Sequence, residues 1–161
     1  MEMLLAPWRE KFILGKKQKG CIFCQRVKQK KDKENLILYR GEKAFIIMNR
    51  FPYNSGHLMV VPYRHIRSLE KLDADELWEL MKLTQLSVLA LKKVMKPQGF
   101  NLGMNLEKVS GAGVSGHLHI HIVPRWTGDT NFMPILGKTK VLSIDLKQTY
   151  LKLKKAFASL K

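Results

Sequence analysis

Residues 116–126 read "GHLHIHIVPRW" and place a histidine at every second position, at His117, His119 and His121. Aliphatic residues fill the positions between these histidines and follow the last one. An alternation with period two predicts a β-strand, here over residues 117–123, whose three imidazoles share one polar face while the other face is buried. Such a strand indicates metal binding or proton and phosphate chemistry. A histidine tag or low-complexity tract is the alternative, but the internal position and the aliphatic partners favour a functional site.

Further strands and two helices are predicted around this run. In chain order we expect a hairpin over residues 35–49, a strand over 56–62, a helix over 73–95, a strand over 99–106, the histidine strand ending at Pro124, and a helix within 145–159. The long helix has Asp73 placed as its N-cap and Pro97 beyond its end. Because the strands follow one another without alternating helices, the fold class is α+β, with five antiparallel strands, one long helix on a face and a C-terminal helix.

The size and charge of the chain limit its organisation and its partners. A chain of 161 residues fits one domain, residues 1–161, with residues 1–20 as a basic N-terminal extension. The 29 Lys and Arg against 13 Asp and Glu give a formal charge of +16, which favours nucleic acid or a polyphosphate nucleotide. The basic residues gather in residues 15–34 and 145–161, not interleaved with aromatic residues as in a single-strand-binding groove, so a solvated surface is the first interpretation.

Two cysteines, Cys21 and Cys24, form a C-x-x-C motif. No run approaches the roughly 18 apolar residues of a membrane span, and the start lacks a signal peptide, so we expect a cytoplasmic protein. In that reducing compartment the motif indicates metal binding or redox activity rather than a structural disulfide. A thioredoxin-like pair is less favoured, because that motif opens a helix after a βαβ pattern, which the sequence does not show.

The spacing of Cys21 and Cys24 suits one Zn²⁺, and a tetrahedral structural site needs two more ligands. We expect His65, which follows a predicted strand end, and one of the three clustered histidines to supply them. A pair of reduced cysteines without a metal is the alternative.

If His117 binds the metal, His119 and His121 remain for chemistry. A neutral imidazole is a good nucleophile toward a polarised phosphorus, and a phosphoramidate intermediate splits a phosphoryl transfer into two easier steps. The "GAG" at residues 111–113 can bring backbone N–H groups to phosphate oxygens, and Arg125 can add positive charge.

The run "HLHIHIV" resembles the signature of the histidine triad (HIT) superfamily of nucleotidyl hydrolases and transferases. The similarity extends to "CIFC", "AFIIMNRFPYNSGHLMVVPYRHI" and "GFNLGMNLEKVSGAGVSGHLHIHIVPRWTGDTNF", and so covers most of the chain between residues 20 and 140. Within the superfamily, "APWR", "NRFPYNSGHLMVVPYRH" and "PRWTGDTNF" are similar to the branch of diadenosine tetraphosphate phosphorylases. The family fold agrees with the strands predicted above.

The resemblance implies a role for each histidine. His119 would attack the α-phosphorus and carry the nucleotidyl group, while His121 would hydrogen-bond the α-phosphate. The first histidine, His117, would complete a structural zinc site with the remaining three ligands, Cys21, Cys24 and His65.

The resemblance also implies a nucleotide site. Asn49 lies where the family binds ribose hydroxyls, and His57 lies in a supporting position. The apolar residues that would enclose the base are Ile22, Phe23 and Phe45, for which an ordinary core position is the alternative.

On the phosphate side, Asn105 matches an amide of the family. Many hydrolases carry a Gln before the triad that stabilises the leaving group, but the stretch here is "GAGVSG" and lacks it. The phosphate contacts would then come from Gly111, Gly113 and Ser115.

The leading hypothesis is an enzyme that cleaves a dinucleoside polyphosphate, such as diadenosine tetraphosphate, through a nucleotidyl-His119 intermediate, with inorganic phosphate as the favoured acceptor. One alternative is a hydrolase of nucleoside phosphoramidates or nucleotide conjugates. Two others are a nucleic-acid-binding protein that acts on adenylated ends, and a metal-storage or redox protein. The resemblance also implies a homodimer that joins two sheets.

Overall fold

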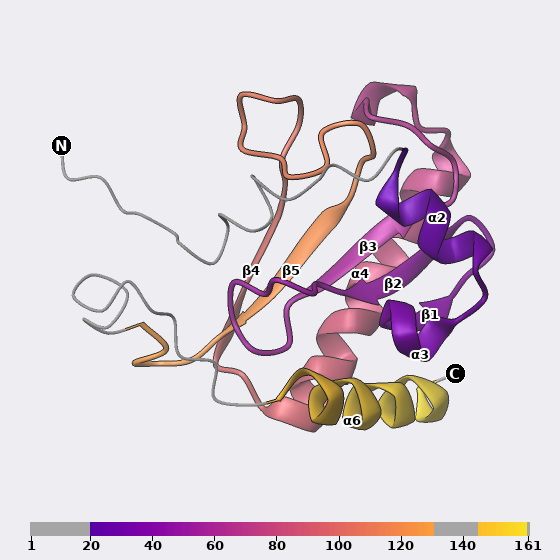
Figure 1. Cartoon of the computed structure of the whole chain (residues 1–161). Coiled ribbons are helices and arrows are strands. Elements are labelled where there is room, and N and C mark those ends of the chain that lie inside the picture. Colours follow the sequence, from indigo (N-terminus) through magenta and orange to yellow (C-terminus); the bar gives the residue numbers. More distant parts are fainter. Residues whose placement is uncertain (1–19, 131–144, 161) are drawn as a thin grey trace, which may run out of the picture.

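The computed structural model describes residues 20–130 and 145–160 (Figure 1). Its strands are β1 (Ile37–Arg40), β2 (Ala44–Met48), β3 (Leu58–Pro62), β4 (Gly99–Met104) and β5 (Ile120–Arg125). Its helices are α2 (Ile22–Lys28), α3 (Asp32–Asn35), α4 (Ala74–Met95) and α6 (Leu146–Ser159), with a 3-10 turn at Leu69–Lys71. Most of the predicted basic extension, "APWR" and the end of "PRWTGDTNF" lie outside the described residues. None of the described helices is long and apolar enough to cross a membrane.

The five strands form one sheet in the order β1-β2-β3-β5-β4, and every neighbouring pair is antiparallel. This confirms the predicted α+β fold, with the long helix α4 and the C-terminal helix α6. The order places β3 beside the triad strand β5 in space, although 57 residues lie between Pro62 and Ile120 in the sequence. The loop that follows β3 therefore lies near the start of the triad.

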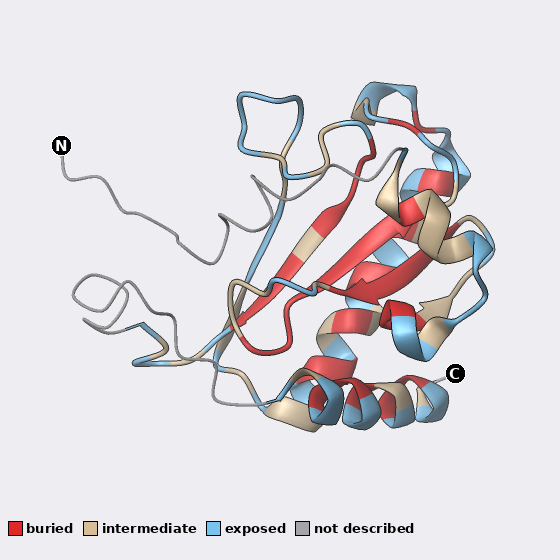
Figure 2. Ribbon diagram, viewed as in Figure 1, coloured by how far each residue is buried: buried red, intermediate tan, exposed pale blue. Residues whose placement is uncertain are grey.

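Alternate side chains of the strands enter two separate cores, because successive residues of a strand point to opposite faces. The helices α4 and α6 cover the face that buries Ile46 (Figure 2). On the other face Phe23 of α2 packs in a second core that includes Met59. His121 pairs with Met59 in the β3–β5 ladder, so it lies on the α2 face of the sheet.

The start of α4 follows the predicted capping pattern. The Asp73 carboxylate accepts a hydrogen bond from the Glu76 N–H at 2.8 Å, and the Glu76 carboxylate accepts one from the Asp73 N–H at 3.0 Å. These bonds satisfy amides that a helix leaves without partners at its first turn. The helix ends at Met95, where Lys96 adopts a left-handed conformation.

The prediction of a strand that begins at His117 is wrong. The strand β5 begins at Ile120, where its ladders with Val60 of β3 and Met104 of β4 both start, although β3 itself continues to Pro62. The Leu118 N–H instead donates to the carbonyl of Ile66 at 2.6 Å. The first two histidines of the triad therefore lie in an irregular segment just before the strand.

The predicted end of the strand is also wrong, since β5 continues through Pro124 to Arg125. The pairing of β5 with β3 stops at Ile122, so at Pro124 the strand has β4 as its only sheet partner. A proline is tolerated where one side of the strand needs no backbone N–H.

The histidine face is not the polar face that the alternation predicts. His117 is 1% and His119 is 5% exposed, because α2 and Phe23 cover them. Neither α2 nor α3 was predicted, and the C-x-x-C does open a helix, since Cys21 is the residue before α2.

Candidate active site and metal centre

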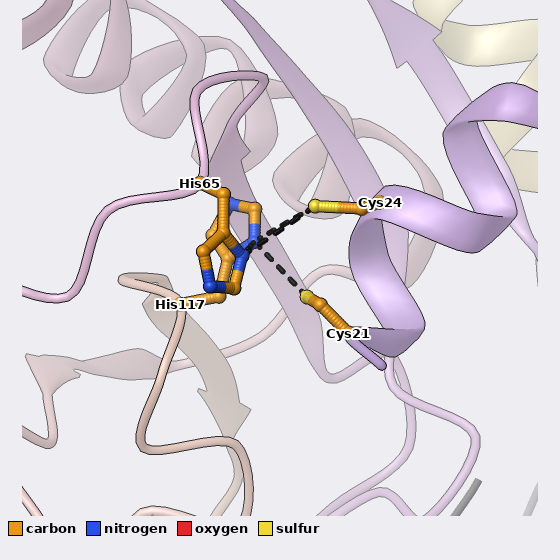
Figure 3. Close-up of side chains that lie close together, drawn as sticks. All are labelled: Cys21, Cys24, His65 and His117. Carbon is orange, nitrogen blue, oxygen red and sulfur yellow. Dashed lines mark hydrogen bonds between the residues drawn. The ribbon is translucent and has the colours of Figure 1, made fainter. Parts of the chain in front are cut away.

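Four predicted metal ligands meet where α2, the segment after β3 and the start of the triad come together (Figure 3). Cys21 precedes α2 and Cys24 lies in its first turn, a spacing that puts both thiols on one side of the helix. The ligand atoms of Cys21, Cys24, His65 and His117 all lie within 4.8 Å of one another. The cluster could therefore hold a metal ion, and the structure selects His117 among the three histidines that the spacing left open.

The ring of His117 is oriented for coordination. Its Nε2 lies 2.9 Å from the carbonyl oxygen of Pro62, which can only accept, so Nε2 carries the hydrogen. The Nδ1 lone pair then faces the cluster, 3.2 Å from both the Cys21 sulfur and the His65 Nδ1. Burial lowers the pKa of His117 to about 4, so the ring is neutral near pH 7 and available to a metal.

The surroundings of Cys24 shift its pKa in the opposite direction to that of His117. Burial raises the pKa of this thiol, and a hydrogen bond with Cys21 adds to the shift. A cation in the cluster reverses this preference, because a coordinated thiol loses its proton. The two cysteines and the two imidazoles thus form a donor set suited to a soft divalent metal.

The middle histidine has a fixed tautomer. The Nδ1 of His119 lies 2.8 Å from the carbonyl oxygen of His117, so Nδ1 carries the hydrogen and donates it. Burial lowers the pKa of His119, which keeps the ring neutral and leaves a lone pair on Nε2. The ring of Phe23 packs against it, with the two centroids 5.2 Å apart. A neutral imidazole with one fixed lone pair can act as a nucleophile or as a base.

The last histidine has the complementary tautomer. The Nδ1 of His57 accepts from the Tyr53 N–H at 3.1 Å and contacts the amide nitrogen of Asn49 at 3.3 Å, so Nε2 of His57 carries the hydrogen. That Nε2 lies 2.9 Å from the Nδ1 of His121, which must accept. A neutral His121 then has its hydrogen on Nε2. The ring centroids of His119 and His121 are 4.7 Å apart, so a lone pair and an N–H donor lie side by side.

The predicted base-binding residues lie on the same face of the sheet. Phe23 and Phe45 are buried in the second core, and Ile22 packs against that core from α2. The ring of Phe45 stacks on Tyr63 with the centroids 5.4 Å apart. Asn49 is half-buried and reaches the triad through His57.

The predicted phosphate-binding residues lie in the connection between β4 and the triad. Asn105 and Ser115 are half-buried, while Gly111 and Gly113 are exposed, and Gly111 has φ +83°, a conformation that favours glycine. In this described segment neither Asn105 nor Ser115 hydrogen-bonds a triad histidine. The predicted cation, Arg125, instead binds the carboxylate of Asp129 with two hydrogen bonds, at 2.6 and 2.8 Å.

Two groups of the site were not predicted. Tyr53 packs against both His57 and His121, with ring centroids 4.7 and 5.7 Å away. The carbonyl of Pro62 orients the His117 ring. The only sequence signal for Tyr53 was that an aromatic residue lies within the turn-rich "RFPYNSG". A backbone carbonyl such as that of Pro62 gives no signal in a sequence, because every residue has one.

Comparison with known proteins identifies the family of the chain. A family model described as the HIT domain matches residues 30–128. The chain belongs to the HIT family. An AP-4-A phosphorylase of Mycobacterium tuberculosis is 46% identical over 123 residues, which are 76% of this chain and 63% of that protein. The chain therefore spans less than two thirds of the length of this HIT relative.

Other HIT proteins match over a larger share of their length. An uncharacterized HIT-like protein of Methanocaldococcus jannaschii is 31% identical over 125 residues, 78% of this chain and 93% of that protein. A zinc-bound histidine triad family protein from Mycobacterium smegmatis has a TM-score of 0.71 at 25% identity and covers 88% of this chain and 95% of its own. A hypothetical histidine triad nucleotide-binding protein from Sulfolobus tokodaii has the same TM-score at 29% identity, covering 88% and 94%.

Proposed function

We propose that the protein is a nucleotidyl transferase that cleaves dinucleoside polyphosphates, such as diadenosine tetraphosphate, at the α-phosphate through a nucleotidyl-His119 intermediate. The observation that carries this proposal is the hydrogen bond from His119 Nδ1 to the His117 carbonyl. It leaves the Nε2 lone pair of His119 beside the N–H donor of His121, a nucleophile next to a group that can bind a phosphate oxygen.

The reaction has two displacements. The Nε2 lone pair of His119 attacks the α-phosphorus, and the bond from that phosphorus to the bridging oxygen breaks, so ATP leaves with the electron pair. The carbonyl of His117 stabilises the positive charge that the ring gains when Nε2 bonds phosphorus. An acceptor oxygen then attacks the phosphorus, and the P–N bond breaks to restore His119.

The acceptor decides the class of enzyme. If inorganic phosphate accepts the nucleotidyl group, the products are ADP and ATP; if water accepts it, they are AMP and ATP. The relative named AP-4-A phosphorylase favours phosphate, and a chain of charge +16 raises the local concentration of such anions.

We also propose that the cluster of Cys21, Cys24, His65 and His117 holds a structural zinc ion. A tetrahedral zinc with bonds of about 2.3 Å to sulfur and 2.0 Å to nitrogen separates a sulfur from a nitrogen by roughly 3.5 Å and two nitrogens by roughly 3.3 Å. The sulfur–nitrogen distances here are 3.2, 3.5 and 3.6 Å, and the nitrogen–nitrogen distance is 3.2 Å. Bound zinc would link these three segments of the chain without an open position for substrate. A cytoplasmic location, also proposed, keeps both thiols reduced.

The nucleotide would lie on the α2 face of the sheet. We propose that Ile22, Phe23 and Phe45 enclose the base and that Asn49, held beside His57, binds the ribose. On the other side of His119, the phosphates would meet the connection that follows β4, through Asn105, Gly111, Gly113 and Ser115. Backbone N–H groups of a glycine-rich segment are suited to phosphate oxygens, and this stretch lacks the Gln side chain found in many hydrolases.

Product analysis tests the proposed reaction. The protein is incubated with diadenosine tetraphosphate, with and without inorganic phosphate, and the nucleotides are separated by chromatography. We expect ADP and ATP in equal amounts, formed only when phosphate is present. AMP formed without phosphate would instead identify a hydrolase. Absence of cleavage in both conditions would contradict this substrate and leave phosphoramidates and adenylated ends as the substrates to test.

We further propose a homodimer that joins two sheets. The edge strand β4 pairs only with β5 within the described chain, and an open edge is a template for another strand. Leu102 of β4 is 53% exposed. A charge at this position would lie at the joined edge in both chains, and the two like charges would oppose pairing.

Sedimentation at micromolar concentration tests the dimer. We expect the mass of two chains for the unchanged protein and of one chain for Leu102→Glu. Leu151→Glu is the matched control, because Leu151 is 50% exposed on α6, away from the β4 edge, and it should leave the dimer intact. A one-chain mass for the unchanged protein would show that the sheets do not join.

A further inference from the structure

The segment that carries the metal ligand His65 has no regular secondary structure, yet its side chains alternate in direction as in an extended chain. The side chain of Arg64 reaches α4, and that of Ile66 enters the core under α4 and α6. His65, between them, points to Cys24, with its Nδ1 3.5 Å from the sulfur (Figure 3). The position of this ligand is therefore set by how its two neighbours are held.

One neighbour, Ile66, is held by the triad segment. Its carbonyl accepts from the Leu118 N–H at 2.6 Å, and its side chain is 8% exposed. This bond ties His65 to the residue that follows His117, so the two imidazole ligands share one backbone connection.

The other neighbour, Arg64, is held by the first turn of α4. Its Nε donates to one oxygen of the Glu76 carboxylate at 2.7 Å, and one of its terminal nitrogens binds the second oxygen. The same nitrogen donates to the carbonyl of Lys71 at 2.8 Å. The Glu76 side chain is only 6% exposed and is fixed by the capping box with Asp73, so the carboxylate is a rigid anchor.

We propose that Arg64, anchored by Glu76, is a positioning residue of the metal centre: it holds the loop so that His65 faces the two cysteines. This inference rests on the proposed zinc ion. His65 is the exposed ligand of the four, whereas His117 is buried and bonded to Pro62, so His65 depends most on an external anchor.

Loss of the anchor lowers metal affinity in a predictable way. When a site is competent only part of the time, its apparent dissociation constant rises by the inverse of the competent fraction. If the freed loop places His65 correctly about one tenth of the time, the zinc dissociation constant rises about tenfold. Replacement of a residue that orients a metal ligand typically costs 10- to 100-fold in metal affinity, which gives a similar range, about tenfold or more.

The structure supplies a matched control for the experiment. Arg125 and Asp129 form the same kind of two-bond pair, with side-chain exposures of 44% and 8% against 49% and 6% for Arg64 and Glu76. Arg64→Met and Arg125→Met therefore remove equivalent ion pairs, but only Arg64 adjoins a metal ligand. In the metal-free protein both variants should lose similar thermal stability, so the stability of that form does not distinguish them.

Zinc affinity is measured by competition with a chromogenic chelator, on the full chain. We expect Arg64→Met to weaken zinc binding about tenfold and Arg125→Met to leave it unchanged. Arg64→Lys, which keeps the charge but not the two parallel bonds, should fall between them and serves if Arg64→Met does not fold. Equal affinity in the Arg64 variants and the unchanged protein overturns the positioning role while the zinc site stands. A full chain that binds no zinc overturns both.

Discussion

Replacement of His119 by alanine is expected to reduce the turnover of diadenosine tetraphosphate by about a thousandfold or more. The variant lacks the only group of the triad whose tautomer presents a fixed lone pair beside the donor of His121. His121 cannot take over, because His57 donates to its Nδ1 and its Nε2 carries the hydrogen. The reaction would then depend on direct attack by the acceptor, without the two-step route.

Two measurements separate this chemical effect from a structural one. Mass spectrometry of the quenched unchanged protein should show a nucleotidyl adduct that His119→Ala lacks. Thr84→Ala removes a similarly buried polar group from α4, on the other side of the sheet, and should keep nearly full activity. Activity of His119→Ala within a few fold of the unchanged protein would rule out this residue as the nucleophile.

The fold was predictable because its signals are local. Short apolar runs bounded by turn residues, and alternation in the histidine stretch, marked the strands, and the helix α4 carried both its apolar spacing and its Asp73 cap. The metal ligands were also predictable in kind, since the pair Cys21 and Cys24 requires two more donors and the sequence offers few histidines. The choice of His117 needed either the family resemblance or the structure.

The errors came from contacts between distant segments. The alternation begins at His117, but the ladders of β5 begin only at Ile120, opposite Val60 of β3 and Met104 of β4. The Leu118 N–H binds the Ile66 carbonyl instead. The polar face that the pattern predicts is covered by α2, whose basic sequence gave little apolar periodicity. Burial under a helix that the sequence did not predict thus overrides the exposed polar face that strand periodicity alone predicts.

The tautomers of the three triad histidines also could not be predicted from the sequence. They depend on the carbonyl oxygens of Pro62 and His117, and every residue has such an oxygen. The chemical difference between His119 and His121 follows from which neighbour each ring meets, a carbonyl in one case and an imidazole N–H in the other. The tautomers therefore come from the structure, whereas the roles of His119 and His121 in the reaction stay predictions.

Removal of the proposed zinc ion is expected to destabilise the protein by several kcal/mol. A ligand that binds only the folded state at about a thousand times its dissociation constant contributes about 4 kcal/mol. For a chain of 161 residues each kcal/mol shifts the midpoint of thermal unfolding by about 2–4 °C, so a strong chelator should lower it on the order of 10 °C. Differential scanning calorimetry with and without the chelator measures this shift.

The variant with both Cys21→Ser and Cys24→Ser tests whether the cluster is the source of that shift. It should unfold near the midpoint of the chelated protein and respond to the chelator by less than about one degree, because serine hydroxyls are poor ligands for zinc. Loss of structure should begin near the cluster, because the cysteines of α2 join His65 and His117 there. The helices α4 and α6 pack on the opposite face of the sheet. Amide hydrogen exchange should therefore rise first in α2 and the residues around His65. A chelator-induced shift of equal size in this variant would place the stabilising metal elsewhere in the protein.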